Sequence, residues 1–138
     1  VIELACNLDD MTPESLSFAM DELFAIGALD VYFTNIGMKK SRPGIILTCM
    51  CREEQRDEML RCVFRNTTTI GVREYSCARW TLRRSERSVE TEFGSVRVKT
   101  SEGYGVKREK AEYDDLARLA RENGCSLDEI RASVARGE

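Results

Sequence analysis

The chain has 138 residues, of which 42% are hydrophobic and 33% are charged, and its formal net charge is −3. This composition is typical of a globular protein with a real core, and the length predicts one domain or slightly more. The negative charge argues against attraction to nucleic acid or to an anionic membrane, and no apolar stretch approaches the ~20 residues that span a bilayer. Because residue 1 is Val rather than Met, we expect the natural chain to start further upstream.

The chain has six cysteines and no histidine. No C-x-x-C pair is present, so the sequence predicts no structural zinc site, and catalytic arrangements that need His are excluded. We expect reduced, mostly buried thiols in a cytoplasmic protein. Cys49 and Cys51 alternate along an apolar stretch and should point to one face of a strand. Core packing is the expected role of this pair, and binding of a soft metal is the alternative.

The first segments predict a strand followed by a helix. Residues 2–8 are mostly apolar and predict the strand, and residues 13–26 predict an amphipathic helix that ends at Gly27. Thr12 is a suitable N-cap, and Pro13 suits the first helical position. The expected apolar stripe of the helix consists of Leu16, Ala19, Met20, Leu23 and Phe24.

Three strands and a second helix are predicted next. Residues 29–36 alternate between apolar and polar side chains, which predicts a half-buried strand. Residues 45–51 are almost continuously apolar, which predicts a central strand covered on both faces. A helix is expected at residues 53–65, and a long strand from the threonine-rich segment 67–73 to about Leu82. The inward side chains of this helix are expected to be Met59, Leu60, Val63 and Phe64.

The predicted order β-α-β-β-α-β is typical of a ferredoxin-like fold, in which two helices cover one face of a four-stranded antiparallel sheet. We therefore predict the α+β class, with a ferredoxin-like domain at residues 1–83 and an extension at residues 84–138. Since an extension of this size buries little apolar surface, we expect it to pack on the first sheet or on another subunit.

The extension is predicted to begin with a β-hairpin. Residues 93–96, Phe-Gly-Ser-Val, have the glycine-first pattern of a type II′ turn. In that register Glu92 faces Arg97 and Glu90 faces Lys99, which leaves the opposite face apolar. This apolar face predicts a homo-oligomer. It consists of Val89, Thr91, Phe93, Val96 and Val98.

A short strand and two helices complete the extension. The strand is expected at residues 104–107, and Gly124 should end the helix that follows. Ser126 and Glu129 form the sequence pattern of a capping box, so the last helix should begin there. These two helices and the hairpin make the extension a candidate oligomerisation element.

Two adjacent carboxylates, Asp9 and Asp10, lie at the joint between the first strand and the first helix. They could favour the positive end of the helix, which is the more frequent role for acidic residues in this position. They could also hold a hard cation such as Mg²⁺, which prefers carboxylate oxygens and often bridges to phosphates. The local sequence leaves both interpretations open.

Positive charge gathers at predicted strand ends. Lys39, Lys40 and Arg42 lie within one turn, and Arg73 ends the segment that begins with three threonines at residues 67–69. Lys and Arg are the usual ligands of phosphate, although a solvated turn with weak ion pairs is the alternative. Together with the two carboxylates, such a group would suit a nucleoside triphosphate and its divalent cation. Further basic residues are Arg83, Arg84, Lys99, Lys107 and Lys110.

Four segments of the chain occur in a characteristic order. They read Asn-Leu-Asp-Asp-Met-Thr-Pro-Glu at 7–14, Gly-Ala-Leu-Asp-Val at 27–31, Met-Lys-Lys-Ser-Arg-Pro-Gly at 38–44 and Arg-Asn-Thr-Thr-Thr-Ile-Gly-Val-Arg at 65–73. In this order and at these separations they closely resemble the nickel-insertion protein LarC family. The resemblance covers nearly the whole chain.

The resemblance implies a role in making the nickel-pincer nucleotide cofactor of lactate racemase. Members of the family insert nickel into a pyridinium bis-thiocarboxylic acid mononucleotide, and they use CTP with Mg or Mn. The chain resembles the C-terminal half of such a protein, the part associated with CTP binding and with a homo-oligomer, for which a trimer-based assembly is one expectation. The implied enzyme is a cytoplasmic chelatase or cyclometallase of the lyase class, in which a His-rich N-terminal half accompanies this chain; whether this chain is active alone is left open.

The resemblance also implies roles for single residues. Asp9 and Asp10 become candidate ligands of the divalent cation, whereas no catalytic residue is assigned. Nickel is expected to be held by substrate sulfurs and by groups outside this chain, with Cys49 and Cys51 as the alternative. Residues 110–116 depart from the family pattern, because Leu116 stands where a cysteine is typical. The expected nucleotide-binding residues are Lys39, Lys40, Arg42, Thr68, Thr69, Arg73, Arg83, Lys99, Lys107 and Lys110.

Two other classes of function remain as alternatives. A ferredoxin-like domain also suits a non-catalytic module that senses a small molecule or nucleotide, an argument from fold analogy alone. RNA binding would need exposed aromatic residues on the central strands together with positive charge. Residues 45–51 contain no aromatic side chain and the net charge is negative, so we expect no nucleic acid partner.

Overall fold

The computed structural model describes residues 1–137. The chain divides into two compact units, Val1–Arg79 and a second unit that begins at Trp80. Each unit has its own sheet and its own buried apolar cluster. The predicted boundary after residue 83 falls within strand β5, which begins at Arg83. None of the helices in residues 1–137 is both long and apolar enough to cross a membrane.

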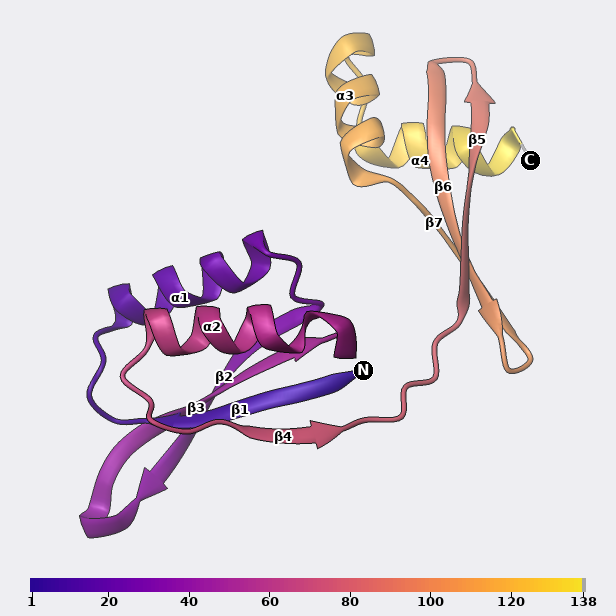
Figure 1. The fold of residues 1–138 in the computed structure, drawn as a ribbon. Helices are drawn as coiled ribbons and strands as arrows, with labels where there is room; N and C mark the ends of the chain where they lie inside the picture. Colours follow the sequence, from indigo (N-terminus) through magenta and orange to yellow (C-terminus); the bar gives the residue numbers. More distant parts are fainter. Residues whose placement is uncertain (138) are drawn as a thin grey trace. The chain divides into compact units, whose positions relative to one another are not determined.

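The first unit has the element order that the sequence predicts. Its sheet has the strand order β2-β3-β1-β4, and all neighbouring strands are antiparallel. Both helices lie on one face of this sheet (Figure 1), which is the ferredoxin-like arrangement. The elements are β1 (Ile2–Leu8), α1 (Pro13–Ala25), β2 (Asp30–Met38), a 3₁₀ turn η1 (Lys39–Ser41), β3 (Arg42–Cys51), a 3₁₀ turn η2 (Glu53–Gln55), α2 (Arg56–Asn66) and β4 (Arg73–Ser76).

Alternate residues of β1 and β3 form the core of the first unit against α1 and α2. β3 is central in the sheet, as predicted, but Ile46 and Met50 on its second face are only half-buried because both helices cover the first face. The buried cluster consists of Ile2, Leu4, Cys6, Leu8, Leu23, Val31, Leu47, Cys49, Cys51, Met59 and Val63.

The prediction that Phe24 and Phe64 point inward is wrong, since these side chains are 44% and 47% exposed. The fully buried positions of α1 are Ala19 and Leu23, which are four residues apart and therefore lie on one line along the helix. Phe24 is displaced from that line by about 100°, because a helix has roughly 3.6 residues per turn. The same displacement separates Phe64 from the buried Val63 of α2.

The predicted long strand that ends near Leu82 is also wrong. β4 ends at Ser76, which lies opposite Ile2, the first residue of β1. One further backbone hydrogen bond joins the Cys77 amide to the Val1 carbonyl at 3.0 Å. Residues 77–82 have no regular structure.

The second unit is a three-stranded antiparallel sheet with the order β5-β6-β7 and two helices. α3 packs against β6, and α4 packs against β5. Gly124 ends α3 in the left-handed conformation, and the capping box of Ser126 and Glu129 begins α4, as predicted. The elements are β5 (Arg83–Thr91), β6 (Gly94–Gly103), β7 (Val106–Ala111), α3 (Tyr113–Asn123) and α4 (Leu127–Arg136).

The predicted hairpin register is wrong. Thr91 lies opposite Gly94, so the turn residues are Glu92 and Phe93. Arg97 therefore lies opposite Ser88, and Lys99 opposite Glu86, rather than opposite Glu92 and Glu90. The Thr91 hydroxyl fixes this turn, because it accepts a hydrogen bond from the Phe93 amide at 3.1 Å and donates one to the Gly94 carbonyl at 2.7 Å.

The apolar face of the hairpin is covered by the helices of the same unit. Val89, Val96 and Val98 are buried against α3 and α4. The second unit therefore builds its own core, and this face no longer argues for a homo-oligomer. The helix residues of the cluster are Leu116, Leu119, Ala120, Ile130 and Val134.

A buried carboxylate ties α3 to β6. Asp115 accepts hydrogen bonds from the Arg97 amide at 2.9 Å and from the Arg97 guanidinium at 2.9 and 3.1 Å. These bonds stabilise the ionised form, so they lower the pKa of Asp115 to about 2. The Arg97 amide lies one residue beyond Val98, which forms the last pair between β6 and β7 with Ala111. Because β7 does not extend beside this amide, the amide donates its hydrogen bond to Asp115.

Replacing Asp115 should destabilise the second unit. We expect Asp115→Asn to lower the melting temperature of this unit by roughly 4–8 °C at pH 7, a typical effect of one lost interaction in a domain of this size. The melting should be followed by circular dichroism and by hydrogen exchange of the α3 amides. Because the pKa of Asp115 is depressed, its contribution is complete above about pH 4 and disappears as the pH falls toward about 2.

The matched control is Asp114→Asn, which removes the same charge from the exposed neighbouring position in the first turn of α3. This control should melt within about 2 °C of the unmodified chain, as surface substitutions usually do. Equal melting temperatures for the two variants, or a difference that persists down to pH 2, would contradict the role of Asp115.

Candidate functional site

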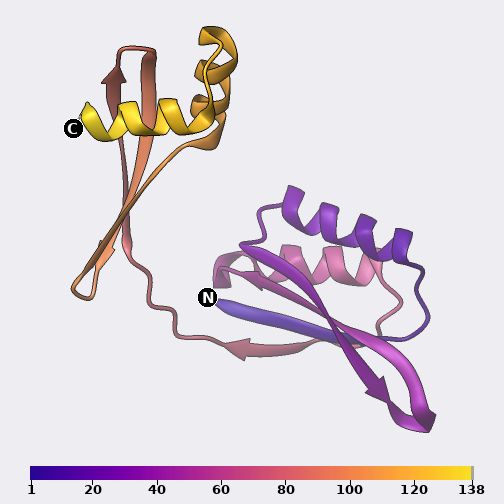
Figure 2. The ribbon, with the colours of Figure 1, turned by 180° about the vertical axis from the view of Figure 1, so that it is seen from behind.

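The candidate site lies where β1 ends. Three segments meet at this end of the first sheet: the β1–α1 loop, the β2–β3 hairpin and the α2–β4 loop (Figures 1 and 2). The antiparallel pairing of Leu8 with Ile45 explains why they meet, because the chain that follows Leu8 leaves the sheet beside the chain that precedes Ile45. The acidic pair and the basic turn of the sequence therefore lie at the same end.

Asp9 and Arg42 form the contact between these two segments. The Arg42 Nη1 atom lies 3.7 Å from Asp9 Oδ2, and the two side chains are 61% and 27% exposed, respectively. An exposed ion pair at this distance adds little to stability, so it can open at small cost when a ligand competes for either partner.

Asp10 connects the β1–α1 loop to the threonine-rich loop. The Thr68 hydroxyl donates a hydrogen bond to Asp10 Oδ1 at 2.5 Å. The neighbouring Thr67 hydroxyl donates to the Val63 carbonyl at the end of α2, and the Thr69 hydroxyl donates to the Gly71 carbonyl, both at 2.8 Å. The three threonines thus hold the loop in a defined shape beside Asp10.

Neither carboxylate caps α1. The cap is Thr12, whose hydroxyl accepts a hydrogen bond from the Ser15 amide at 3.3 Å, and Pro13 is the first helical residue, as predicted. Asp9 and Asp10 instead contact Arg42 and Thr68 from other segments. Their positions therefore support the interpretation in which the carboxylates belong to a site.

Arg73 belongs to a second group of contacts, on the neighbouring strands. Its Nη2 atom donates to Asn7 Oδ1 at 2.8 Å, and its Nε atom donates to the Tyr75 hydroxyl oxygen at 3.1 Å. Neither Asn7 nor Tyr75 was predicted from the sequence as a site residue. The alternation of side chains along a strand could have indicated them. Ala5 pairs with Arg73; Asn7 lies two residues after Ala5, and Tyr75 lies two residues after Arg73, so Asn7, Arg73 and Tyr75 share one face of the sheet.

A small cavity of about 240 Å³ adjoins Asp9. Gly44 forms part of its wall, and a Cβ at this position would lie 2.9 Å from the Leu8 carbonyl oxygen and 2.5 Å from the Met38 sulfur. The close approach of β3 to β1 therefore requires glycine here. The lining residues are Leu8, Asp9, Met11, Leu16, Asn35, Pro43, Gly44 and Ile45.

Lys39 and Lys40 lie at the exposed tip of the β2–β3 hairpin, in the turn η1. Neither lysine forms an ion pair with another residue in the described part of the chain. Lys40 and Ser41 have φ angles of 61° and 57°, in the left-handed region that residues other than glycine rarely adopt. Such strained backbone often occurs at ligand-binding turns.

Four of the predicted nucleotide-binding residues belong to the second unit. Arg83 forms an ion pair with Glu102, Lys99 with Glu112 at 2.7 Å, and Lys107 with Glu109 at 2.9 Å. Lys110 is exposed on β7. The cluster at the end of β1 consists of first-unit residues, and three of the four second-unit cations are already neutralised by a glutamate.

The donor set of the cluster fits a metal–nucleotide complex better than an isolated metal ion. Among residues 1–137, no group of three or more His, Cys, Asp and Glu side chains is placed to hold a metal ion. Mg²⁺ sites commonly use only one or two protein carboxylates and complete the octahedron with phosphate oxygens and water. Asp9 and Asp10 can supply that number of carboxylates.

The thiol pair is buried in the core and is not part of this cluster. Cys49 and Cys51 are fully buried, and the Cys49 thiol donates to the Met59 sulfur at 3.9 Å. Burial raises the pKa of Cys49 to about 12, so this side chain is a neutral thiol near neutral pH. Of the two roles considered for this pair, the structure supports core packing.

Comparisons with known proteins agree with the sequence resemblance. Residues 1–131 match the family described as nickel insertion protein. The pyridinium-3,5-bisthiocarboxylic acid mononucleotide nickel insertion protein of Acetivibrio thermocellus is 38% identical over 131 residues, which cover 95% of this chain and 32% of that protein. The protein of the same name from Clostridium acetobutylicum is 40% identical over 132 residues, covering 95% of this chain and 31% of that protein. The chain thus spans about a third of the length of these curated relatives.

Two solved structures have a similar fold. One is LarC2, the C-terminal domain of a cyclometallase involved in the synthesis of the NPN cofactor of lactate racemase, in its apo form; its TM-score is 0.81 at 33% identity, covering 99% of this chain and 94% of that chain. The other is protein MK0293 of Methanopyrus kandleri, with a TM-score of 0.78 at 23% identity, covering 97% of this chain and 84% of that chain; this likeness concerns the fold alone.

These likenesses place the chain among α+β domains similar to the C-terminal domain of a cyclometallase. More particularly, the chain belongs to the nickel insertion protein family. The family resemblance predicted from the four sequence segments is confirmed.

The difference in burial among the cysteines can be measured directly. At pH 8, iodoacetamide should alkylate the partly exposed Cys62, Cys77 and Cys125 of the folded chain, whereas the buried Cys49 and Cys51 should remain unmodified. The pKa of Cys49, about 12, leaves its thiolate about a thousandfold less populated than that of an ordinary thiol. Peptide mapping by mass spectrometry gives the extent of modification at each position.

The control for this measurement is the chain in guanidinium chloride, in which all six cysteines should react. Modification of Cys49 in the folded chain at a rate similar to that of Cys125 would show that the thiol is accessible. Metal binding by Cys49 would then have to be reconsidered.

Proposed function

We propose that this chain is the CTP-binding part of an enzyme that inserts nickel into a pyridinium bis-thiocarboxylic acid mononucleotide, making the nickel-pincer cofactor of lactate racemase. The observation that carries the proposal is the contact of Asp9 with Arg42, beside the hydrogen bond between Asp10 and Thr68. These contacts bring carboxylates for a cation and a guanidinium for phosphates to one end of the sheet. Family membership supplies the chemical context.

In this proposal Asp9 and Asp10 bind the Mg²⁺ or Mn²⁺ ion that accompanies CTP. The divalent cation neutralises charge on the phosphates when it is bound. If Asp9 held that cation, the Arg42 guanidinium would be free of its weak ion pair and could bind a phosphate oxygen. The ion pair between Asp9 and Arg42, at 3.7 Å, would therefore hold both side chains in the unliganded chain. When the ligand binds, each side chain would replace this contact with a contact to the ligand.

The surrounding residues would complete the phosphate site. Lys39 and Lys40 lie in the strained turn next to Arg42, where neither has an ion-pair partner among the described residues and both are available to an anion. Thr68 and Thr69 provide hydroxyl groups from a loop that is already ordered. Arg73, held by Asn7 and Tyr75, extends the positive charge onto the face of the sheet.

The nucleotide would activate a carboxyl, thiocarboxyl or phosphate group of the substrate. The role of the lysines and arginines would be to stabilise negative charge that develops during this step. Nickel would enter as a substrate, held by the thiocarboxylate sulfurs and by groups outside this chain. We assign the activity to the whole cytoplasmic enzyme, with its N-terminal half, and we expect it to work as a homo-oligomer.

CTP with Mn²⁺ should stabilise the chain against heat. A ligand at about 100 times its Kd stabilises the folded state by roughly 2.7 kcal/mol, which should raise the melting temperature of the first unit by several degrees. Asp9→Asn should remove the part of this shift that depends on Mn²⁺. Arg42→Gln should weaken binding about tenfold through loss of a charge-assisted hydrogen bond, while the unliganded stability changes by less than ~0.5 kcal/mol.

Arg61→Gln on the exposed surface of α2 is the matched control, because it removes the same charge away from the β1 end of the sheet and should leave the shift unchanged. The absence of any shift with CTP and Mn²⁺ would contradict the proposal. A shift that is equal with and without Mn²⁺ would instead favour the non-catalytic sensor module.

A further inference from the structure

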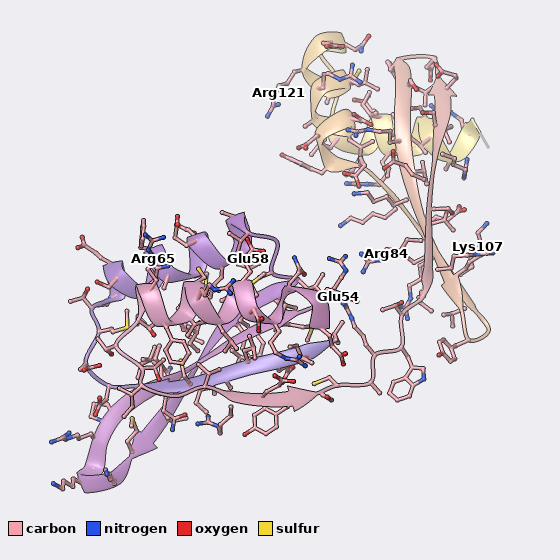
Figure 3. All side chains as sticks on the ribbon, viewed as in Figure 1. Glu54, Glu58, Arg65, Arg84, Lys107 and Arg121 are labelled. Carbon is pink, nitrogen blue, oxygen red and sulfur yellow. The ribbon has the colours of Figure 1, made fainter. Side chains whose placement is uncertain are left out.

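The second sheet has one face that its helices do not cover. Because α3 and α4 pack on the side of Val89, Val96 and Val98, the residues between these positions point to the opposite side. Figure 3 shows Arg84 and Lys107 on opposite sides of the strands, in agreement with this alternation. The face opposite the helices is defined here as the open face of the second sheet.

The register places three cations close together on this open face. Ser101 of β6 lies opposite Arg84 of β5 and opposite Arg108 of β7, so the three residues form one row across the sheet. The next row on the same face consists of Glu86, Lys99 and Lys110. Directly opposite Cβ atoms are separated by ~4.5–5.5 Å, so both arginines can reach an anion above Ser101.

The cations nearest Ser101 are not neutralised within the described part of the chain. Among residues 1–137, no ion pair or side-chain hydrogen bond engages Arg84, Arg108 or Lys110, and all three residues are exposed. Lys99, in contrast, pairs with Glu112 at 2.7 Å, and Arg97 pairs with Asp115. Glu86 is the acidic residue of the second row, so the open face keeps an excess of positive charge around Ser101.

We propose that Arg84, Ser101, Arg108 and Lys110 bind the phosphate group of a pyridinium mononucleotide. Two guanidinium groups on opposite sides of a hydroxyl can bind one phosphate through several charge-assisted hydrogen bonds, with Lys110 as an additional point charge. This site shares no residue with the metal–nucleotide site at Asp9, because all four residues belong to the second unit.

The choice of ligand rests on the proposed function. The relatives are named for a pyridinium-3,5-bisthiocarboxylic acid mononucleotide, which carries a phosphate and two acidic groups. Arg84, Arg108 and Lys110, which have no ion-pair partner among residues 1–137, provide positive charge to balance the negative charge of such a small polyanion. Binding of a nucleic acid strand would instead favour aromatic side chains for base stacking. The open-face positions of the three strands, from Arg84 to Lys110, include none.

Nicotinic acid mononucleotide is a suitable probe, because it is a pyridinium mononucleotide with one phosphate and one carboxylate. Isothermal titration calorimetry of the 138-residue chain should give saturable binding. Arg84→Gln and Arg108→Gln should each weaken it about tenfold, and Ser101→Asp should abolish it by placing a negative charge between the arginines. Nicotinic acid riboside, which lacks the phosphate, should bind the unmodified chain at least tenfold more weakly than the mononucleotide.

Arg121→Gln is the matched control, since it removes one exposed arginine from α3, which covers the other face of the sheet. Its affinity for the probe should equal that of the unmodified chain. Absence of saturable binding, equal affinity for the riboside, or unchanged affinity in both Arg84→Gln and Arg108→Gln would overturn the inference.

The melting shift with CTP and Mn²⁺ separates this inference from the proposed function. The shift should be the same in Arg84→Gln, Arg108→Gln and the unmodified chain, because these residues lie outside the first unit. If the shift is absent while the mononucleotide binds as expected, the proposed function fails and the second-unit phosphate site remains. If the shift is present but the mononucleotide binding is not affected by the variants, only the further inference fails.

Discussion

The antiparallel pairing of β1 with β3 is the constraint on which the candidate site depends. Leu8 lies opposite Ile45, so the segment with Asp9 and the segment with Arg42 leave the sheet together. A shift of one residue would turn Leu4, Cys6 and Leu8 out of the core and would also separate the two charged groups. The buried side chains of β1 thus position the site as well as stabilising the sheet.

Local physical chemistry was enough to predict most elements of the first unit. Thr12 and Pro13 define the start of α1, and Gly27, with a φ of 95°, follows its end. The sequence did not indicate that Phe24 is exposed, because a broad apolar stripe does not show which part of it meets the sheet. The length of β4 was also beyond local reasoning, because it depends on pairing with β1 and not on the composition of the segment itself.

The charged residues of the candidate site could be predicted from the sequence, but the contacts that hold them in place could not. The acidic pair and the basic turn stand out in the sequence, whereas the bonds of Arg73 to Asn7 and Tyr75 depend on the register between β1 and β4. The prediction of the hairpin register in the second unit is wrong for a related reason. Gly94 fits the first turn position as well as the position after the turn, and local pattern alone does not choose between them.

Each unit has its own hydrophobic core, so the segment between the two units is not needed to complete either core. Residues 77–82 lie outside both sheets, and neither hydrophobic cluster draws on them. Exposed connections of this kind tolerate insertions and deletions better than packed elements do. We therefore expect a change in the length of this segment to leave the interior of each unit intact.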